Sequence, residues 1–260
     1  METIVDYKTM GGGVAVITLN RAEAANALSR EMLRELDRLL DGIEFNPGIR
    51  GVILTGSGEK AFCAGADLKE RAGMNDREVK ETVALIGKVV TKLERLPQPT
   101  AAAINGACFG GGLELALACD IRMAADSAKM GLTETSLGII PGAGGTQRLP
   151  RLIGISRAKE LIYTARRINA QDALTYGLIS YAAPQEDLLD RAMELMLEIS
   201  KNGPIAVQQA KKAIDLGGQG DLETGLSIEK ICYSVTIPTR DRQEGLLAFK
   251  EKRQPQYTGE

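Results

Sequence analysis

The segment best suited to chemistry is ACFGGGLELALACD, at residues 107–120. In it, three consecutive glycines, Gly110 to Gly112, precede a leucine and then Glu114. The apolar run at 115–119 predicts a buried helix that begins at the glycines. The first N–H groups of a helix have no partner within it and can bind negative charge. Without side chains, the glycines would let a ligand carbonyl reach these donors, close to the Glu114 carboxylate. The alternative is an ordinary glycine turn, with Glu114 favoured only by the helix macrodipole.

The chain of 260 residues contains no histidine, and this absence limits its chemistry. A Ser-His-Asp or Cys-His nucleophile system is excluded, and so is a metal site built on histidine. Acid–base chemistry must use carboxylates, lysine, tyrosine, cysteine or the backbone. The cysteines Cys63, Cys108, Cys119 and Cys232 form no CxxC pair and no metal-ligand spacing. They indicate buried, reduced residues of a cytosolic protein, and we predict no metal site.

The overall charge is close to balanced, with 32 lysine and arginine residues against 34 aspartate and glutamate residues. No global field therefore points to nucleic acid or to an anionic membrane. The first residues, METIVDYKTM, lack the pattern of a signal peptide, and no stretch resembles a membrane span. We expect a cytoplasmic protein with one large domain, a terminal extension and no membrane partner.

Strands and helices alternate in the first two-thirds of the chain. The expected elements are a strand at 13–21, a helix at 29–44 with Ser29 as N-cap, a strand at 51–56, a helix at 77–96 and a strand at 100–106. This alternation favours an α/β domain. From about residue 182 the pattern becomes helical throughout, with expected helices at 186–201, 204–216, 221–236 and 239–252.

Two further glycine-rich segments lie at 61–70 and 139–151. The first, AFCAGADLKE, follows the strand at 51–56 and puts small residues where backbone could be exposed to a ligand. The second, IIPGAGGTQRLPR, fits neither phosphate-loop nor dinucleotide-binding patterns. Taken singly, each segment is more typical of a plain turn.

Taken together, five segments resemble the crotonase, or enoyl-CoA hydratase, superfamily. They are NRAEAANALS (20–29), AFCAGADLKE (61–70), INGACFGGGLELALACD (104–120), KMGLTETSLGIIPGAGGTQRLPR (129–151) and GLLAFKEKR (245–253). The resemblance implies a ClpP-like spiral of ββα units at 1–195, which holds the CoA-binding and catalytic site. It also implies a helical region at 196–260 for oligomerisation and active-site cover, giving a homo-oligomer that is a trimer or a dimer of trimers.

The same resemblance implies an acyl-CoA substrate and no tightly bound cofactor, because the acyl group arrives as a coenzyme A thioester. The backbone N–H groups of Ala66 and Gly111 would form an oxyanion hole for the thioester carbonyl. Glu114 and Glu134 would be the two carboxylates that hydrate a 2,3 double bond, with Glu114 as the base toward water and Glu134 as the acid. Gly142, in the turn IPGAGG, would help to place water and the reacting atoms.

The resemblance also assigns residues to coenzyme A binding. The segment 64–69 would line the adenine pocket, through Ala64, Ala66, Asp67, Leu68 and Lys69. Lys252 would reach a CoA phosphate from the C-terminal helix, either in the same chain or in a neighbouring subunit. The alternative for Lys252 is an ordinary solvated helix lysine.

Several activities remain open within this superfamily, because fold alone does not determine the reaction. The expected reaction is hydration of a short or branched enoyl-CoA to a 3-hydroxyacyl-CoA. The segments FCAGADLKERAGM and TIPTRDRQEGLLAFKEKR are most similar to methylglutaconyl-CoA hydratases of the AU-rich-RNA-binding type, so that substrate is one alternative. Double-bond isomerisation is another, although isomerases of this superfamily generally need only one central carboxylate.

RNA binding is the alternative from a different functional class. In the relatives of the AU-rich-RNA-binding type, a lysine-rich helix near the N-terminus is implicated. The matching helix at 29–44 carries three arginines against five acidic residues, Glu31, Glu35, Asp37, Asp41 and Glu44. It therefore has no net basic face, and we do not expect nucleic acid as a partner.

Overall fold

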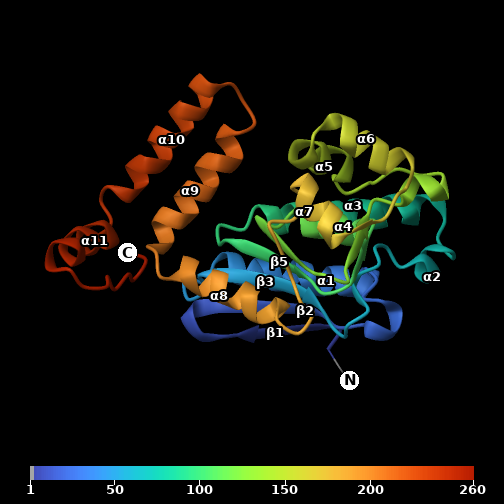
Figure 1. The fold of residues 1–260 in the computed structure, drawn as a ribbon, viewed down its shortest axis with the longest axis horizontal. Helices are drawn as coiled ribbons and strands as arrows, with labels where there is room; N and C mark the ends of the chain where they lie inside the picture. The colour runs from blue at the N-terminus through green and yellow to red at the C-terminus, as the bar shows by residue number, and fades with distance from the viewer. Residues whose placement is uncertain (1–2) are drawn as a thin grey trace.

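The computed structural model describes residues 3–260, which form two sheets of mostly parallel strands surrounded by helices (Figure 1). The larger sheet has the strand order β1-β2-β3-β5-β7-β10, and the smaller has the order β4-β6-β8-β9. The strands are β1 (Val5–Thr9), β2 (Val14–Leu19), β3 (Gly51–Gly56), β4 (Ala61–Cys63), β5 (Thr100–Ile104), β6 (Ala107–Phe109), β7 (Ile121–Ala125), β8 (Lys129–Gly131), β9 (Ile168–Asn169) and β10 (Tyr181–Ala183). The α-helices are α1 (Arg30–Glu44), α2 (Leu68–Arg71), α3 (Asp76–Glu94), α4 (Gly111–Leu117), α5 (Gly145–Ile153), α6 (Ile155–Tyr163), α7 (Ala170–Tyr176), α8 (Leu188–Ser200), α9 (Pro204–Gly217), α10 (Leu222–Thr236) and α11 (Arg240–Glu251). Short 3₁₀ turns are η1 (Gly11–Gly13), η2 (Ala22–Ala24) and η3 (Glu134–Leu137).

A repeated unit of two strands and a helix generates both sheets. β3 joins the larger sheet and β4 the smaller before α3, and β5, β6 and α4 repeat this order. The neighbouring strands β3, β5 and β7 are parallel, so each must be reached by a crossover connection. The second strand and the helix of each unit supply that crossover. The predicted α/β class and its ββα units are confirmed.

The longer predicted elements lie where their patterns place them. The Ser29 hydroxyl accepts a hydrogen bond from the Met32 N–H and caps α1, as predicted. The apolar face of α1 is buried at Met32, Leu33, Leu36, Leu40 and Ile43. Asn75 and Glu78 form a reciprocal capping box at the start of α3. The strands at 14–19, 51–56 and 100–104 are also present.

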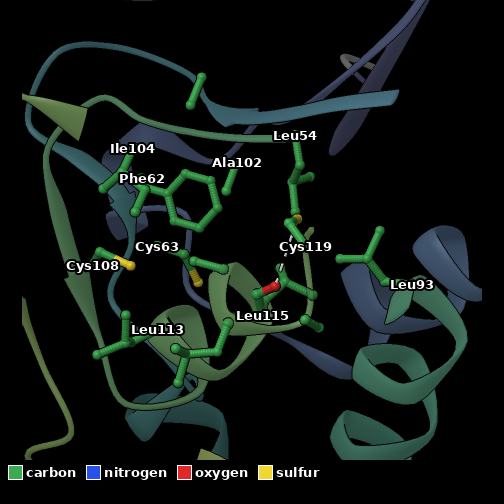
Figure 2. Close-up of a cluster of buried hydrophobic side chains, with 14 of the residues drawn as sticks. Leu54, Phe62, Cys63, Leu93, Ala102, Ile104, Cys108, Leu113, Leu115 and Cys119 are labelled. Atoms are coloured by element: carbon green, nitrogen blue, oxygen red, sulfur yellow. Dashed lines mark hydrogen bonds between the residues drawn. The ribbon is translucent and has the colours of Figure 1, made fainter. Parts of the chain in front are cut away.

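Helix α4 lies in the hydrophobic core, and all seven of its residues are buried. Figure 2 shows Leu113 and Leu115 of α4 beside Phe62, Cys63 and Cys108 of the smaller sheet. The four cysteines are free and buried, so the interpretation of these residues as packing groups is confirmed. Burial raises the pKa of Cys63 to about 12, which keeps its thiol protonated.

The chain ends in a helical extension. α8 spans residue 195, the predicted boundary, and packs against strands of the larger sheet. α9 and α10 then form a hairpin that projects away from the sheets, with α11 at its base, far from α2 and α4 (Figure 1). The division into 1–195 and 196–260 remains a prediction.

Two properties concern the described part of the chain as a whole. None of its helices combines the length and the hydropathy needed to cross a bilayer. Within the same residues, no group of three or more histidine, cysteine, aspartate or glutamate side chains is arranged to hold a metal ion.

Candidate active site

Gly110 and Gly112 of the 110–112 turn are required for different physical reasons. Gly110 has a φ of 51° and a ψ of −126°, a backbone conformation that residues with a Cβ rarely adopt. A Cβ built at Gly110 would also lie 3.1 Å from Oε1 of Glu134. A Cβ at Gly112 would overlap the carbonyl oxygen of Cys63, because α4 packs directly on that strand. The turn therefore brings the start of α4 against both the smaller sheet and Glu134.

Gly111 lies beside the backbone of the Gly65–Ala66 loop. A Cβ built at Gly111 would lie 3.7 Å from the Ala66 nitrogen and 3.4 Å from Cδ1 of Leu28. The loop is held by a parallel bridge in which the Leu28 N–H donates to the Gly65 carbonyl over 2.8 Å. Across residues 3–260, the N–H groups of Ala66 and Gly111 make no hydrogen bond. The structure thus brings together the two N–H groups that the sequence singles out, and leaves both available as donors.

Glu114 lies in the first turn of α4 and is 2% exposed. Its Oε1 accepts hydrogen bonds from the N–H groups of Ala143, at 2.7 Å, and Gly145, at 2.8 Å. Burial raises the pKa of the Glu114 carboxyl above its usual value. The two backbone donors, and the positive charge of Arg148, partly oppose this shift because they stabilise the ionised form.

Glu134 stands at the start of η3, and its carboxylate lies over Gly110. Its Oε2 is buried and has no hydrogen-bond partner in the described structure. Burial raises the pKa of Glu134 to about 7; its own backbone N–H opposes this shift, and the negative charge of Glu114 adds to it. The two carboxyl groups therefore meet at the glycine turn but differ in environment, since Glu114 accepts from the N–H groups of Ala143 and Gly145, whereas Oε2 of Glu134 has no partner in the described structure.

The turn at 142–145 is the support of Glu114. A Cβ at Gly142 would lie 2.9 Å from Cγ1 of Val83, so this residue contacts α3. The guanidinium of Arg148 donates to the Ala143 carbonyl at 2.8 Å. The same guanidinium forms a bidentate pair with Glu94, with distances of 2.7 and 2.6 Å.

Sequence reasoning missed the Ala143 and Gly145 donors and the pair of Arg148 with Glu94. Backbone N–H groups carry no residue signature, and Arg148 and Glu94 are 54 positions apart. Only the glycines of IPGAGG, already noted as a turn, gave any signal.

A narrow pocket with a cavity volume of about 10 Å³ lies beside Ala66, which carries one of the two unpaired donors. It is lined by Leu28, Ala66, Asp67, Glu70, Arg71, Met74, Val79, Thr82, Val83 and Ile86. Ala66 and Leu28 belong to the neighbourhood of Gly111, and Val83 touches Gly142. The pocket therefore runs from the donor pair along the α2–α3 segment, and its wall is mainly apolar.

The residues predicted to bind coenzyme A fall into two groups. Ala64, Leu68 and Lys69 are exposed next to Ala66. The Asp67 carboxylate caps α2 and pairs with Arg21 at 3.1 Å, so its side chain is occupied by structural contacts. Lys252 is exposed at the end of α11, which lies far from α2 and α4 (Figure 1). Within one chain, the structure does not bring Lys252 to the other site residues.

Comparison with known proteins assigns a family to this site. Residues 9–260 match the family described as enoyl-CoA hydratase/isomerase. The chain belongs to the enoyl-CoA hydratase/isomerase family. It is 60% identical over 246 residues to YngF of Bacillus subtilis, a protein named for the same activities, with 95% of each chain covered. The crystal structure of an enoyl-CoA hydratase from Bacillus anthracis superposes with a TM-score of 0.98 at 56% identity, over 99% of this chain and all of that one.

A second group of relatives carries a narrower name. The mitochondrial methylglutaconyl-CoA hydratase of Mus musculus is 52% identical over 252 residues, covering 95% of this chain and 80% of the mouse protein. Membership of the enoyl-CoA hydratase/isomerase family confirms the predicted superfamily and its fold. It also confirms the prediction of an enzyme of the enoyl-CoA hydratase type, since the relatives are enzymes of the hydro-lyase class.

Proposed function

We propose that this enzyme adds water across the 2,3 double bond of a short or branched enoyl-CoA and forms a 3-hydroxyacyl-CoA. The observation that carries the proposal is the pairing of Glu114 and Glu134 beside the unbonded N–H groups of Ala66 and Gly111. Hydration needs a base for water, an acid for the α-carbon and donors for the charge on the thioester oxygen. This chain has a candidate for each role around the start of α4.

In the proposed reaction, the thioester carbonyl accepts hydrogen bonds from the N–H groups of Ala66 and Gly111. Glu114 takes a proton from water as the water oxygen bonds to the β-carbon. The electron pair of the double bond moves toward the carbonyl, and its negative charge rests on the oxygen held by the two donors. Glu134 then gives its proton to the α-carbon, which restores the carbonyl. Each oxyanion donor of this kind is typically worth about 2.7–4 kcal/mol in the transition state.

The roles of the two carboxyl groups follow from their surroundings. Two N–H donors stabilise Glu114 as an anion, the form that a base requires. Oε2 of Glu134 has no donor in the described structure, and burial raises the pKa of this carboxyl to about 7, so a substantial fraction carries a proton near neutral pH. Gly142, whose neighbour Ala143 holds Glu114, would help to confine the water. The pairing of two carboxyl groups also favours hydration over isomerisation, which needs only one.

The coenzyme A part of the substrate is proposed to lie along the exposed segment 64–69, with no tightly bound cofactor required. The side chains of Leu68 and Lys69 are open to solvent there, and Ala64 leaves room for the adenine. Lys252 would approach the CoA phosphates from a neighbouring subunit, because α11 lies far from α2 in its own chain (Figure 1).

Methylglutaconyl-CoA is the second candidate substrate. It is favoured by the 52% identity to the mouse enzyme of that name, which extends over 95% of this chain. Both candidate substrates use the same carboxylates and donors, so they differ only in the acyl group that the pocket accepts.

The test is the loss of the ultraviolet absorbance of the conjugated enoyl thioester, followed with crotonyl-CoA and with 3-methylglutaconyl-CoA. Glu114→Gln and Glu134→Gln should each lower kcat by about 10²- to 10⁴-fold, the usual contribution of general acid–base catalysis. Glu160→Gln is the matched control, because Glu160 is an exposed glutamate paired with Arg166. Full activity in either site variant, or no loss of absorbance with the wild-type protein, would contradict the proposal.

A further inference from the structure

One lysine of the helical extension is bonded to the rest of the chain. Lys211 lies midway along α9, and its side chain is only 10% exposed. Its ammonium donates to Oδ2 of Asp120, at 2.9 Å, and to the backbone carbonyl of Gln98, at 3.1 Å. Among the described residues, the only other hydrogen bond between 204–260 and 3–200 joins Arg50 to the Tyr257 carbonyl. Within the hairpin of α9 and α10, Lys211 is therefore the one polar attachment to the sheets and their helices.

The two acceptors of Lys211 lie just beyond the C-terminal ends of α4 and α3. Asp120 follows α4, and Gln98 lies in the connection between α3 and β5. Asp120 is itself fixed, because the same Oδ2 accepts from the N–H of Thr100, at 2.7 Å, and from its hydroxyl, at 3.1 Å. The side-chain amide of Gln98 is buried and donates to the Ile43 carbonyl of α1 at 2.9 Å. Lys211 thus joins two fixed points, one beyond each helix.

These two helices both take part in holding the proposed base. Glu114 lies in the first turn of α4, and Glu94 is the last residue of α3. Glu94 forms the bidentate pair with Arg148, which donates to the Ala143 carbonyl. The N–H of Ala143 donates in turn to Glu114. An unbroken series of hydrogen bonds therefore runs from the end of α3 to the carboxylate of the base.

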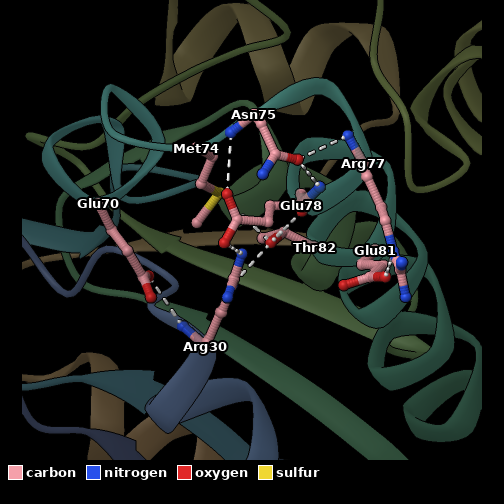
Figure 3. Close-up of polar contacts among 8 residues, drawn as sticks. All are labelled: Arg30, Glu70, Met74, Asn75, Arg77, Glu78, Glu81 and Thr82. Carbon is pink, nitrogen blue, oxygen red and sulfur yellow. Dashed lines mark hydrogen bonds and ion pairs between the residues drawn. The ribbon is translucent and has the colours of Figure 1, made fainter.

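The start of α3 is anchored without any contribution from the extension. Figure 3 shows Asn75 and Glu78 in the capping box, with Arg30 of α1 reaching toward Thr82. The Nε of Arg30 donates to the Thr82 hydroxyl over 3.0 Å. Further along, Lys92 of α3 pairs with acidic residues of α1. A variant at Lys211 should therefore keep this fold and change only what lies at the ends of α3 and α4.

Charge connects Lys211 with the same end of α3. Asp215 lies one turn further along α9, where the charges of Asp120, Lys211 and Glu94 all act on its carboxyl. Burial raises the pKa of Asp215, and the negative charge of Asp120 adds to this shift. The charge of Lys211 opposes it, and that of Glu94 adds to it. Without the ammonium, the carboxylates of Asp120 and Asp215 would act unbalanced on the pair of Glu94 with Arg148.

We propose that Lys211 is a positioning residue for Glu114, so that docking of the helical extension supports the hydration step. The inference rests on the proposed function, in which Glu114 is the base toward water. Lys211 touches no reacting atom. It holds the connections after α3 and α4, and it balances the carboxylates that would otherwise draw Arg148 away from the turn at 142–145. Such a residue affects kcat, whereas a residue that serves only coenzyme A binding affects KM.

The experiment measures kcat and KM for hydration of crotonyl-CoA by the wild type, Lys211→Met, Lys211→Arg and the control Lys212→Met. Each protein is taken from the size-exclusion fraction that has the wild-type mass. Lys212 is the next residue of α9 and is exposed. Lys211→Met should lower kcat about tenfold, the order expected for a misplaced catalytic group, with a smaller change in KM. Lys211→Arg keeps the charge and should restore most of the rate, and Lys212→Met should stay within about twofold of the wild type.

Two further readouts distinguish positioning from a purely structural role. The charged groups that face Glu114 are Arg148 on α5 and Glu134 on η3. Lys211→Met should move the acidic limb of the pH profile upward, because Arg148 lowers the pKa of Glu114 only while it stays in place. Arg148→Met and the double variant with Lys211→Met should have the same kcat within about twofold, since both substitutions act through one guanidinium.

A rise of KM with an unchanged kcat in Lys211→Met would assign the lysine to coenzyme A binding and would overturn the inference. Unchanged kinetics, a loss of kcat without a shift of the acidic limb, or additive losses in the double variant would also overturn it. In each of these cases, hydration of crotonyl-CoA by the wild type would leave the proposed function standing. A wild-type protein that does not hydrate this substrate would remove the proposed function, and this inference with it.

Discussion

The protonation of Glu134 should set the upper limit of the pH range for hydration. Its pKa is raised to about 7 by burial and by the charge of Glu114, so the acid form is lost as the pH rises through that value. Glu114, whose pKa is also raised by burial, loses its base form as the pH falls. We therefore expect a bell-shaped profile of kcat/KM with its upper limb near pH 7. A profile that stays flat up to pH 9 would contradict the assignment of Glu134 as the acid.

The raised pKa of Glu134 should also cost stability at high pH. Between about pH 4.5 and pH 7 the folded protein binds more protons than the unfolded chain, so the free energy of unfolding falls as the pH rises through this window. Glu134→Gln removes the ionisable group and should raise stability at pH 8 by on the order of 2 kcal/mol, with little effect at pH 4. Thermal melts of both proteins at the two pH values measure this. The same increment at both would show that the effect is not electrostatic.

At the residue scale, the catalytic side chains could be predicted from the sequence, whereas the groups that hold them in place could not. Glu114 and Glu134 could be identified because each stands in a motif of the superfamily. Ala143 and Gly145 could not, because the groups that act are backbone N–H groups whose direction depends on the turn. Lys211 lies in a predicted helix, yet its partners Asp120 and Gln98 are 91 and 113 positions away.

At the element scale, two substitutions at the start of α4 distinguish an effect on packing from an effect on catalysis. Gly112→Ala should destabilise the fold by roughly 3 kcal/mol, because its Cβ would overlap the backbone carbonyl of Cys63, which cannot easily move. Gly111→Ala should fold normally, because its Cβ would meet only ordinary contacts of 3.4 and 3.7 Å. Its methyl group would nevertheless lie between the two proposed donors, and we expect activity to fall about 100-fold. Circular dichroism melts and hydration rates on both variants test this. A fully active Gly111→Ala would contradict the proposed oxyanion hole.

The first turn of α5 is held in place by Arg148, which we expect to act as a positioning residue. Arg148→Met should lower kcat about tenfold or more, since misplacement of a catalytic group is costly, and should move the acidic limb of the pH profile upward. The shift has this sign because the charge of Arg148 lowers the pKa of Glu114. Arg148→Lys should restore the position of the limb in part. Arg151→Met, on the exposed side of the same helix, is the control. A loss of rate without any shift of the limb would indicate a purely structural role.

Elements were predictable where they were long and periodic. The helices α1, α3 and α8 to α11 and the strands β2, β3 and β5 lie within a few residues of the expected ranges. The strands of the smaller sheet have only two or three residues, too few for an alternating pattern, so β4, β6, β8 and β9 were not expected from periodicity. The ββα arrangement came instead from the family resemblance.

At the scale of the whole molecule, the helical extension buries little of its own surface in a single chain. α9 has no buried residue, and α10 buries only Cys232 within the described structure. Large apolar side chains on these helices and α11 are exposed, among them Ile214, Leu222, Ile231, Tyr233, Leu246 and Phe249. Isolated chains rarely leave so many apolar groups in water. This surface supports the proposal that the extension joins copies of this chain, and an adjacent copy could then bring its Lys252 to the coenzyme A segment.

The final prediction concerns this association. We expect light scattering after size exclusion to give the mass of three or six chains for the wild type. Phe249→Asp should shift the population toward smaller species, because Phe249 is 87% exposed and burial of such a side chain contributes about 1.5–3 kcal/mol per subunit. Phe45→Asp is the matched control, since Phe45 is 80% exposed but lies at the end of α1, outside the helical extension. Dissociation should raise KM for the thioester more than it lowers kcat, because Glu114 and Glu134 stay in one chain while Lys252 is withdrawn. A wild-type monomer with full activity at micromolar concentration would contradict both the association and the role of Lys252.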